Sequence, residues 1–288
     1  MEDKERRKEK RKIFLRTLFA KKPVLVGAVL IILFLLIAVL AGVISPYDPY
    51  AISPMEIWNY PSGSHLLGTD GTGRDVLSRV IYGTRTSLIV GLGSVLCSTV
   101  IGIALGLISG YIGGIVDAVI SRFLDAFMAV PMILLALCLG MVFGVGTKNV
   151  VIVLGLSFAP VYARMMRGQV ISIKNSDYIM AEQVLGAKKG RIMLRHILPN
   201  CISPLIVMMT KNIGDAIIGE ASLSFLGMGI SSPTATWGGM ISESYTKISS
   251  NPAFAVVPGV CIVLMVLSFN LFGDGLRDAM DPRMRGKI

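Results

Sequence analysis

The chain has 288 residues, of which 53% are hydrophobic and 16% are charged, and its mean hydropathy is +0.69. This composition excludes an ordinary soluble domain and indicates an integral membrane protein. The net charge of +10 does not indicate a nucleic-acid partner, because the chain has neither interleaved aromatic residues near its basic regions nor a recognisable nucleic-acid-binding module.

Three regions carry most of the positive charge. Residues 1–22 contain ten Lys or Arg residues, residues 164–195 contain seven, and the tail after residue 273 contains four. Lys and Arg accumulate on the cytoplasmic side of membrane proteins, where they also meet anionic lipid headgroups. We therefore expect both termini and residues 164–195 on the cytoplasmic side, with residues 1–22 solvated or associated with lipid headgroups.

The first apolar segment, residues 24–44, is an unbroken run of 21 residues. It is too long for the core of a signal peptide and can cross a hydrocarbon layer of about 30 Å, so we predict an uncleaved first span. An extracytoplasmic loop follows to residue 86. Its GTDGTG stretch lacks the GK[ST] of a phosphate-binding loop and is interpreted as a turn.

Directly after this stretch, residues 75–81 have the pattern of a short amphipathic helix. We expect this helix to lie on the outer membrane surface, with Arg74 and Arg79 on its polar side. Residues 87–108 are the predicted second span. This span contains four glycines suited to close helix packing, Gly91, Gly93, Gly102 and Gly106.

The third predicted span, residues 115–145, contains Arg122 and Asp125, which are three residues apart and expected to pair. Pro131 is expected to kink this helix. The fourth span, residues 150–163, is short and is followed by basic residues, so it should end near the cytoplasmic face.

A polar and basic stretch, residues 178–200, separates two strongly apolar regions. We predict a short helix over 178–185, which Gly186 closes in the left-handed conformation, and a second helix over 189–198, which Pro199 ends. The residues alone favour a cytoplasmic loop that lies against anionic headgroups.

The fifth predicted span, residues 204–229, carries Lys211, Asp215 and Glu220. Charged residues at membrane depth face a bundle interior or an aqueous cavity and are candidates for function. Lys211 and Asp215 are four residues apart and should neutralise each other. This favours a structural pair over a ligand site. Glu220 has no partner at helical spacing and is the first candidate for a translocation path or a subunit interface, with Lys211 and Asp215 as further candidates.

The last predicted span is residues 253–272. Trp58 and Trp237 are expected at the outer interface as belt aromatics. The cysteines are interpreted as small buried hydrophobes, and they are Cys97, Cys138, Cys201 and Cys261.

The chain shows no signature of an enzyme or a metal site. It has no HExxH, GxSxG or Walker A motif, and His65 has no ligand partner at suitable spacing. We therefore predict no catalytic residue, no metal and no cofactor on this chain. A membrane enzyme and a passive channel remain alternative functions.

Several blocks of the sequence resemble known permeases. Ala181, Gly186 and the ending Ile197-Leu198-Pro199 resemble the EAA loop of the membrane subunits of bacterial ABC importers, although Met180 and Glu182 stand where that loop usually has Glu and Ala. The stretch of residues 65–88, GEASLSFLGMG and NLFGDGLRDAMDPR resemble the second permease subunit of the dipeptide, oligopeptide and nickel group.

This resemblance implies an all-α, six-span type I ABC importer permease (MetI-like) in the bacterial plasma (inner) membrane, with cytoplasmic termini. The expected organisation is a basic segment (1–22), a first span and loop (23–86), a five-span core (87–273) with a coupling loop at 176–200, and a tail (274–288). The coupling residues would be Ala181, Glu182, Gly186, Ala187, Arg191, Ile197, Leu198 and Pro199.

The implied partners are a paralogous permease, two ABC ATPase subunits that bind ATP and Mg, an extracytoplasmic solute-binding protein and membrane lipid. Di- or oligopeptides are the expected substrates. Nickel or a metal chelate is the alternative within the same group.

Overall fold

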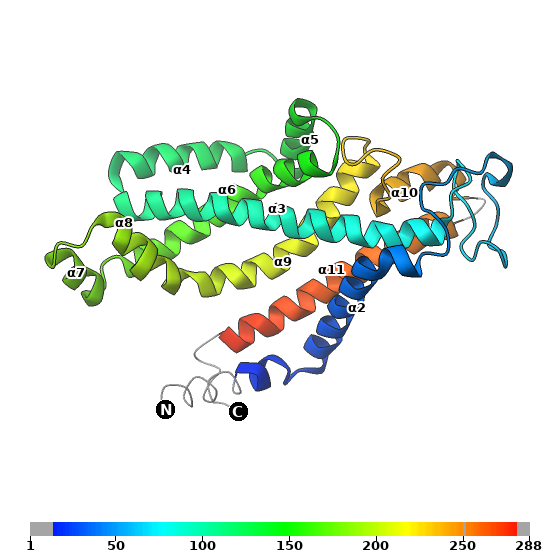
Figure 1. Ribbon diagram of the computed structural model, residues 1–288. Coiled ribbons are helices and arrows are strands. Elements are labelled where there is room, and N and C mark those ends of the chain that lie inside the picture. The colour runs from blue at the N-terminus through cyan, green and yellow to red at the C-terminus, as the bar shows by residue number, and fades with distance from the viewer. Residues whose placement is uncertain (1–13, 250–251, 281–288) are drawn as a thin grey trace.

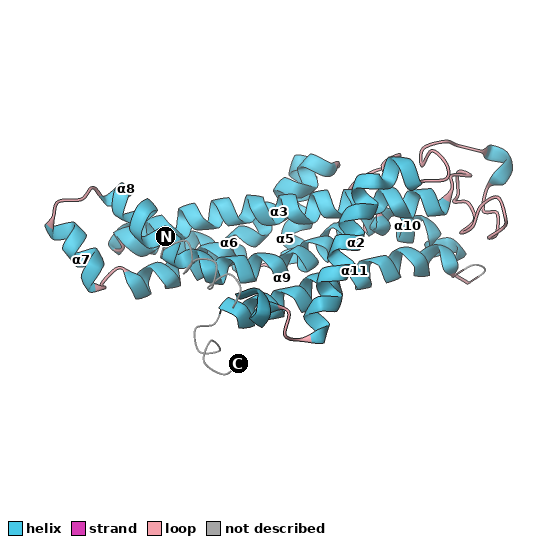
Figure 2. Cartoon of the chain, turned by 60° about the horizontal axis from the view of Figure 1, so that its bottom comes forward, coloured by secondary structure: helices cyan, strands magenta, loops and turns pink. Residues whose placement is uncertain are grey.

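The computed structural model describes residues 14–249 and 252–280, and the remainder of the predicted basic segment and tail lies outside them. The described part of the chain is helical and contains no strand (Figure 2). Its main helices are α2 (Lys22–Ile44), α3 (Val76–Ile112), α4 (Gly114–Met128), α5 (Met132–Phe143), α6 (Thr147–Ile173), α7 (Asp177–Val184), α8 (Lys189–Arg191), a π-helix (Ile192–Ile197), α9 (Leu198–Phe225), α10 (Trp237–Ser244) and α11 (Ala253–Met280).

The helices form an elongated bundle with two different ends (Figure 1). We call the end that carries α7 and α8 the basic end, and the end that carries α10 and residues 45–75 the loop end. Helices α3, α6 and α9 run along the bundle between these ends, and α2 packs against α11 and α3. The predicted coupling segment lies at the basic end, and the candidate charged residues lie along α9.

Five helices are long and apolar enough to cross a membrane, namely α2, α3, α6, the continuous stretch from α8 to α9, and α11. The helices α4 and α5 qualify together as a sixth span that is bent by 96°. The predicted all-α, six-span arrangement is therefore confirmed.

The bend between α4 and α5 is larger than the predicted kink. Pro131 stands between the two helices, and it supplies no N–H while disfavouring a helical conformation at the residue before it.

The predicted pair of Arg122 with Asp125 is wrong. Asp125 instead accepts a hydrogen bond of 2.6 Å from Arg164 on α6, because the two helices lie side by side.

The predicted surface helix near residue 75 is also wrong, because these residues are the first two turns of α3. Arg74 and Arg79 are 3% and 2% exposed, so they do not face an aqueous surface. Asp75 caps the helix, since its side chain accepts a hydrogen bond of 2.8 Å from the Ser78 N–H. The long helix α3 thus begins directly at the loop end, and its first turns are buried.

Small residues allow α3 to approach α6 closely, as the sequence predicted for Gly102 and Gly106. A Cβ atom on Gly102 would collide with Tyr162, and one on Gly106 would collide with the Ala163 carbonyl and Met166. Gly110, one turn further on, faces Val170. The pair α3 and α6 therefore forms the tightly packed centre of the bundle.

The helix that begins at Lys189 does not end at Pro199, contrary to the prediction. Residues 189–225 form one continuous stretch in which a π-helical segment, Ile192–Ile197, joins α8 to α9. Pro199 occupies the first turn of α9, where a residue without an N–H is tolerated. The polar stretch is thus joined rigidly to the fifth span.

Trp237 is fully buried rather than placed in an interfacial belt. Its indole N–H donates a hydrogen bond of 3.0 Å to the Val80 carbonyl, and its ring lies edge-on to Phe34. It therefore fixes α10 against α3 and α2. Trp58 is half-buried and packs on Phe254.

Candidate functional site

The predicted coupling segment forms a helical hairpin at the basic end. α7 is followed by a turn at residues 185–188 and then by α8. Gly186 has φ = +76°, its N–H donates to the Gln183 carbonyl at 3.0 Å, and the Ala187 N–H donates to the Glu182 carbonyl at 3.0 Å. This pair of hydrogen bonds is a Schellman motif, so the predicted helix closure by Gly186 is confirmed.

The hairpin is attached to the bundle by few buried side chains. Ile179 is the buried residue of α7, and Ile192 and Ile197 are buried in the π-helical segment. Glu182 Oε1 lies 3.7 Å from His196 Nε2, which connects the two arms of the hairpin. By contrast, Val184 and Leu185 are 87% and 81% exposed. The tip of α7 therefore presents apolar side chains outward.

The structure brings four of the eight predicted coupling residues together. Glu182, Gly186, Ala187 and Arg191 line one hollow of about 440 Å³ beside the turn. Ala181 lies on the exposed part of α7. The other three residues lie at the base of the hairpin, with Ile197 buried, Leu198 half-buried and Pro199 exposed.

The charged residues of α9 do not form the predicted arrangement. Lys211 Nζ pairs with Asp274 Oδ1 of α11 at 2.7 Å, not with Asp215. The side chain of Asp215 is exposed, with no ion-pair partner among the described residues. Asp215 thus lies on the surface of α9, whereas Lys211 is half-buried beside α11.

Glu220 is fully buried between α9 and its neighbours. Its Oε1 accepts a hydrogen bond of 2.8 Å from Ser224, whose hydroxyl oxygen accepts one of 3.1 Å from the Ile230 N–H. Glu220 therefore does have a partner at helical spacing, and it holds the turn after α9.

Sequence reasoning missed a buried charge cluster at the loop end. Asp70 accepts a hydrogen bond of 2.7 Å from Arg74 Nε, and Arg74 Nη2 reaches Glu243 on α10 at 3.2 Å. Arg79 Nε lies 3.2 Å from Asp70, and its Nη1 donates to the carbonyls of Pro49 and Pro233 at 3.3 Å. The cluster connects the loop of residues 45–75 to α3 and α10.

Burial by itself would raise the pKa of Asp70. The backbone N–H groups of Thr72 and Arg74, the Thr72 hydroxyl and the Arg74 guanidinium outweigh burial, and the pKa of Asp70 lies below its ordinary value. Asp70 is therefore ionised at neutral pH. The alternating charges between residues 70 and 79 were visible in the sequence, but the partner Glu243 lies far along the chain.

His65 is structural, as predicted. Its ring is buried beneath Tyr47, and its Nδ1 lies 2.8 Å from Asp75 Oδ1. Among the described residues, no group of three His, Cys, Asp or Glu side chains could hold a metal ion. The four cysteines are free. The prediction that they are buried is confirmed for Cys201, whereas Cys97 and Cys261 are half-buried and Cys138 is exposed.

Comparison with known proteins identifies the family. The family described as "Binding-protein-dependent transport system inner membrane component" matches residues 102–286, and that described as "N-terminal TM domain of oligopeptide transport permease C" matches residues 11–61. The chain therefore belongs to the binding-protein-dependent inner-membrane transport components, the permeases of ABC importers. It is a multi-pass protein of the plasma membrane, and its family is one of transport permeases rather than enzymes.

Two relatives match most of the chain. The dipeptide transport system permease protein DppC of Alkalihalophilus pseudofirmus is 41% identical over 92% of this chain and 87% of its own length. The glutathione transport system permease protein GsiD of Escherichia coli is 40% identical over 90% of this chain and 86% of its own length. The chain is thus a permease of the dipeptide and oligopeptide type.

Two solved structures of the MetNI methionine ABC transporter in inward-facing conformations have the same fold. They match with TM-scores of 0.59 and 0.58 at 19% and 21% identity. Each match covers 70% of this chain and 96% or 97% of the solved chain. The six-span type I importer permease fold is therefore confirmed.

Proposed function

We propose that this chain is one of two different permeases in an importer of di- or oligopeptides, and that the hairpin of residues 176–200 couples it to an ATPase subunit. The observation that carries the proposal is the tip of α7, where Val184 and Leu185 are almost fully exposed although the arms of the hairpin are connected and anchored. An apolar helix tip that is held in place but left uncovered is suited to a groove on a partner protein.

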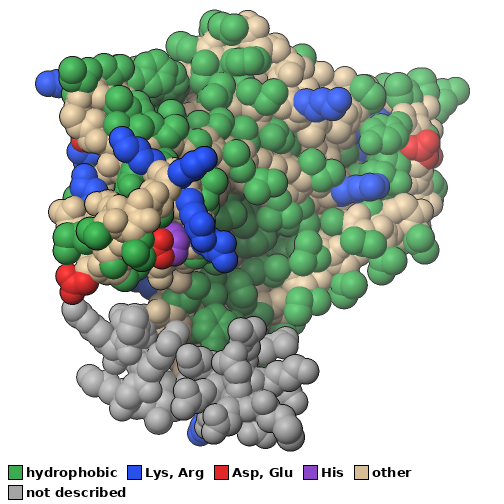
Figure 3. All heavy atoms as spheres, turned by 60° about the vertical axis from the view of Figure 1, so that its left-hand side comes forward, with side chains coloured by type: hydrophobic (Ala, Val, Ile, Leu, Met, Phe, Trp, Pro, Cys, Tyr) green, Lys and Arg blue, Asp and Glu red, His purple; other side chains and the backbone are tan. Residues whose placement is uncertain are grey.

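The charge around this tip supports the same proposal. Lys188 is the last residue of the turn, and Lys189 and Arg191 follow it in α8. Figure 3 shows basic side chains gathered on this face of the molecule. Closure of two ATPase subunits on ATP and Mg would move the hairpin, and the unbroken helix from Lys189 to Phe225 would carry that movement into the bundle.

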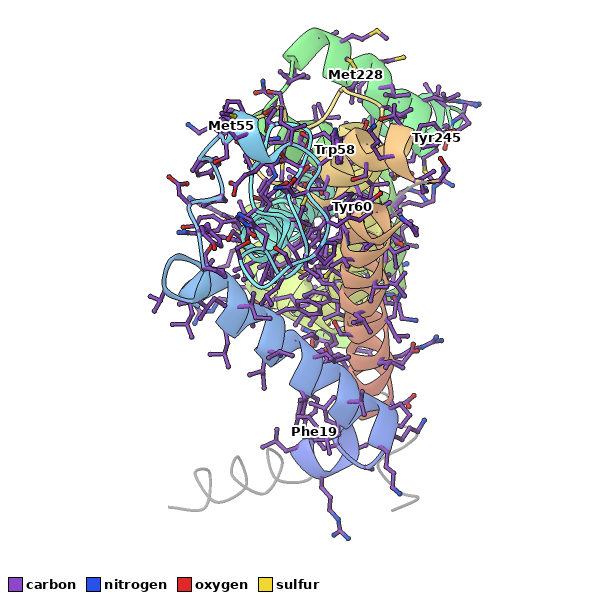
Figure 4. The ribbon with its side chains drawn as sticks, turned by 90° about the vertical axis from the view of Figure 1, so that its right-hand side faces the viewer. Phe19, Met55, Trp58, Tyr60, Met228 and Tyr245 are labelled. Carbon is purple, nitrogen blue, oxygen red and sulfur yellow. The ribbon has the colours of Figure 1, made fainter. Side chains whose placement is uncertain are left out.

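At the opposite end, the loop end would receive substrate from an extracytoplasmic binding protein. Met55 and Tyr60 of the loop are 96% and 63% exposed, and Tyr245, which follows α10, is 64% exposed. Figure 4 looks onto this end and shows the labelled side chains on both segments. Exposed aromatic and Met side chains are typical of protein-binding surfaces. The basic end would then face the cytoplasm.

Peptides are the proposed substrates because the matched relatives are a dipeptide permease and a glutathione permease. None of the described residues offers an observation in favour of nickel. Membership in the ABC importer family supports ATPase and binding-protein partners, and the proposal adds a second, related permease and a pair of ATPase subunits.

The test is to purify the tagged chain in a mild detergent, identify the proteins that accompany it, and reconstitute them in vesicles. We expect a second permease and two Walker A ATPases, and ATP-dependent dipeptide uptake that requires the binding protein. Recovery of the chain alone, with ion current across a bilayer in the absence of ATP, would overturn the proposal in favour of a channel.

A further inference from the structure

A polar pocket lies where the hairpin of residues 176–200 meets the bundle. It has a volume of about 510 Å³ and is lined by the ends of α3 and α6 on one side and by residues of α7, α8 and the turn between them on the other. Figure 1 shows the end of α3 beside α8 at the basic end. The charged side chains in the lining are Lys174 and Lys189, and Asn175 and Gln183 add two amides. The lining therefore has two cations and no carboxylate.

The chain neutralises neither of these two lysines. Lys174 Nζ donates a hydrogen bond of 3.1 Å to the Gly110 carbonyl, which holds the ammonium group at the end of α3 and leaves two of its three N–H donors for a ligand. Neither lysine has an ion-pair partner within residues 14–249 and 252–280. Glu182 of α7 lies 3.7 Å from His196 instead. Because two like charges that face one hollow repel each other, the pocket favours an anion.

The pocket opens at the edge of an apolar surface. Ile112 lines it and is exposed at the end of α3. After a turn at Gly113, α4 runs back along α3 (Figure 1), and its Ile115 and Val119 are exposed as well. Since α3 spans the membrane, such side chains face acyl chains, and Tyr111 in the pocket lining lies where aromatic residues gather at the membrane–water interface.

We propose that this pocket binds the phosphate of an anionic phospholipid, with Lys174 and Lys189 as its cationic partners. Basic pockets between spans are typical of headgroup sites, and a phosphate accepts charge-assisted hydrogen bonds from both ammonium groups. A soluble phosphate would occupy only the polar part, whereas the acyl chains of a lipid also cover the apolar side chains at the edge. The bound headgroup contacts the bundle and the hairpin together. Lipid binding here does not depend on which substrate the importer carries.

The test uses the full-length chain, purified in a mild neutral detergent with the subunits that accompany it. Phosphatidylglycerol is titrated in, and calorimetry measures its affinity. We expect Lys174→Gln and Lys189→Gln each to weaken binding about fivefold, the usual contribution of one Lys or Arg at a headgroup. Lys174→Arg and Lys189→Arg keep the charge and should bind nearly as tightly as the unmodified protein. The matched control is Lys188→Gln, because Lys188 is adjacent to Lys189 but lines the neighbouring hollow, and it should leave the affinity unchanged.

Phosphatidylcholine with the same acyl chains and soluble glycerol 3-phosphate are titrated in parallel. Weaker binding of both than of phosphatidylglycerol supports the inference. Equal binding of phosphatidylcholine would show that the pocket does not recognise headgroup charge, and equal binding of glycerol 3-phosphate would assign it to a soluble phosphate. Either result would overturn the inference. So would unchanged affinity in both Gln variants of the pocket, or a loss with Lys188→Gln as large as that with Lys189→Gln.

Discussion

The Asp70 carboxylate receives hydrogen bonds from two backbone N–H groups, one hydroxyl and one guanidinium. Such an environment favours the charged form of the acid. Because the side chain is almost fully buried beside two arginines, removal of its charge leaves both guanidinium groups with less compensation. The cluster therefore stabilises the loop end only while Asp70 is ionised.

A pH dependence follows from the lowered pKa of Asp70. A depressed pKa contributes stability that is present above the ordinary value of 3.8 and is lost as the pH falls through the pKa of the folded state. We expect Asp70→Asn to lower the free energy of unfolding by about 3 kcal/mol at pH 7. The difference from the unmodified protein should stay constant down to about pH 5 and shrink below about pH 4.

Thermal unfolding of the detergent-solubilised protein at several pH values measures this difference. Asp48→Asn is the matched control, because Asp48 is an exposed carboxylate in the same loop, and it should have little effect at any pH. A difference that stays the same down to pH 2 would show that the Asp70 charge does not stabilise the loop end.

Single residues differ in how well the sequence predicts them. The left-handed conformation of Gly186 was predicted because it depends on neighbours along the chain, and the structural role of His65 was predicted because the sequence offers it no ligand partner at suitable spacing. The pair of Lys211 with Asp274 was not, because the helical spacing offered Asp215 as a closer candidate and nothing local reveals a contact across two spans. The same reason concealed Glu243 as a partner of Arg74.

At the scale of elements, the turn between α7 and α8 depends on one backbone conformation. Gly186 adopts φ = +76°, and a Cβ atom there would meet no other atom within 4 Å. A substitution therefore acts through the backbone alone, and the left-handed conformation costs an L-residue about 1–2 kcal/mol. Proline is worse, because its φ is fixed near −65° and it cannot donate to Gln183.

We expect Gly186→Pro to abolish ATP-driven uptake and Gly186→Ala to reduce it, with normal amounts of both variants in the membrane. Gly190→Ala is the matched control, because Gly190 lies in α8 without a left-handed φ and a Cβ atom there meets nothing within 4 Å. It should transport normally. Uptake is measured in vesicles and membrane content by immunoblotting, and normal uptake by Gly186→Pro would contradict the coupling role.

The predicted elements were accurate where an apolar run was long and uninterrupted, as in α2. They were less accurate where charged residues interrupted the pattern. The first turns of α3 looked like a surface helix because Arg74 and Arg79 are usually solvated, and burial of both became possible only through Asp70 and Glu243. Pro131 indicated a break correctly, but its angle depends on what α4 and α5 pack against.

For the whole molecule, hydropathy and charge predicted six spans with both termini inside, and the spans are confirmed. The orientation stays a prediction, and it is tested with single cysteines at opposite ends. Met55 lies at the loop end and Val184 at the basic end, and their side chains are 96% and 87% exposed. The exposed Cys138 is first replaced by Ser to remove its thiol.

An impermeant maleimide should label M55C in right-side-out vesicles and V184C only in inverted ones. The reverse pattern would place the basic end outside and remove the basis for ATPase coupling. The parent with Cys138→Ser alone should remain unlabelled in both preparations.

The continuous helical stretch of residues 189–225 also has a mechanical consequence. Its 37 residues make a rod about 55 Å long. Such a rod acts as a lever arm, so that each degree of tilt about one end displaces the other end by about 1 Å. A rotation of only a few degrees at the hairpin would therefore move the turn that Glu220 and Ser224 hold by more than the length of a hydrogen bond.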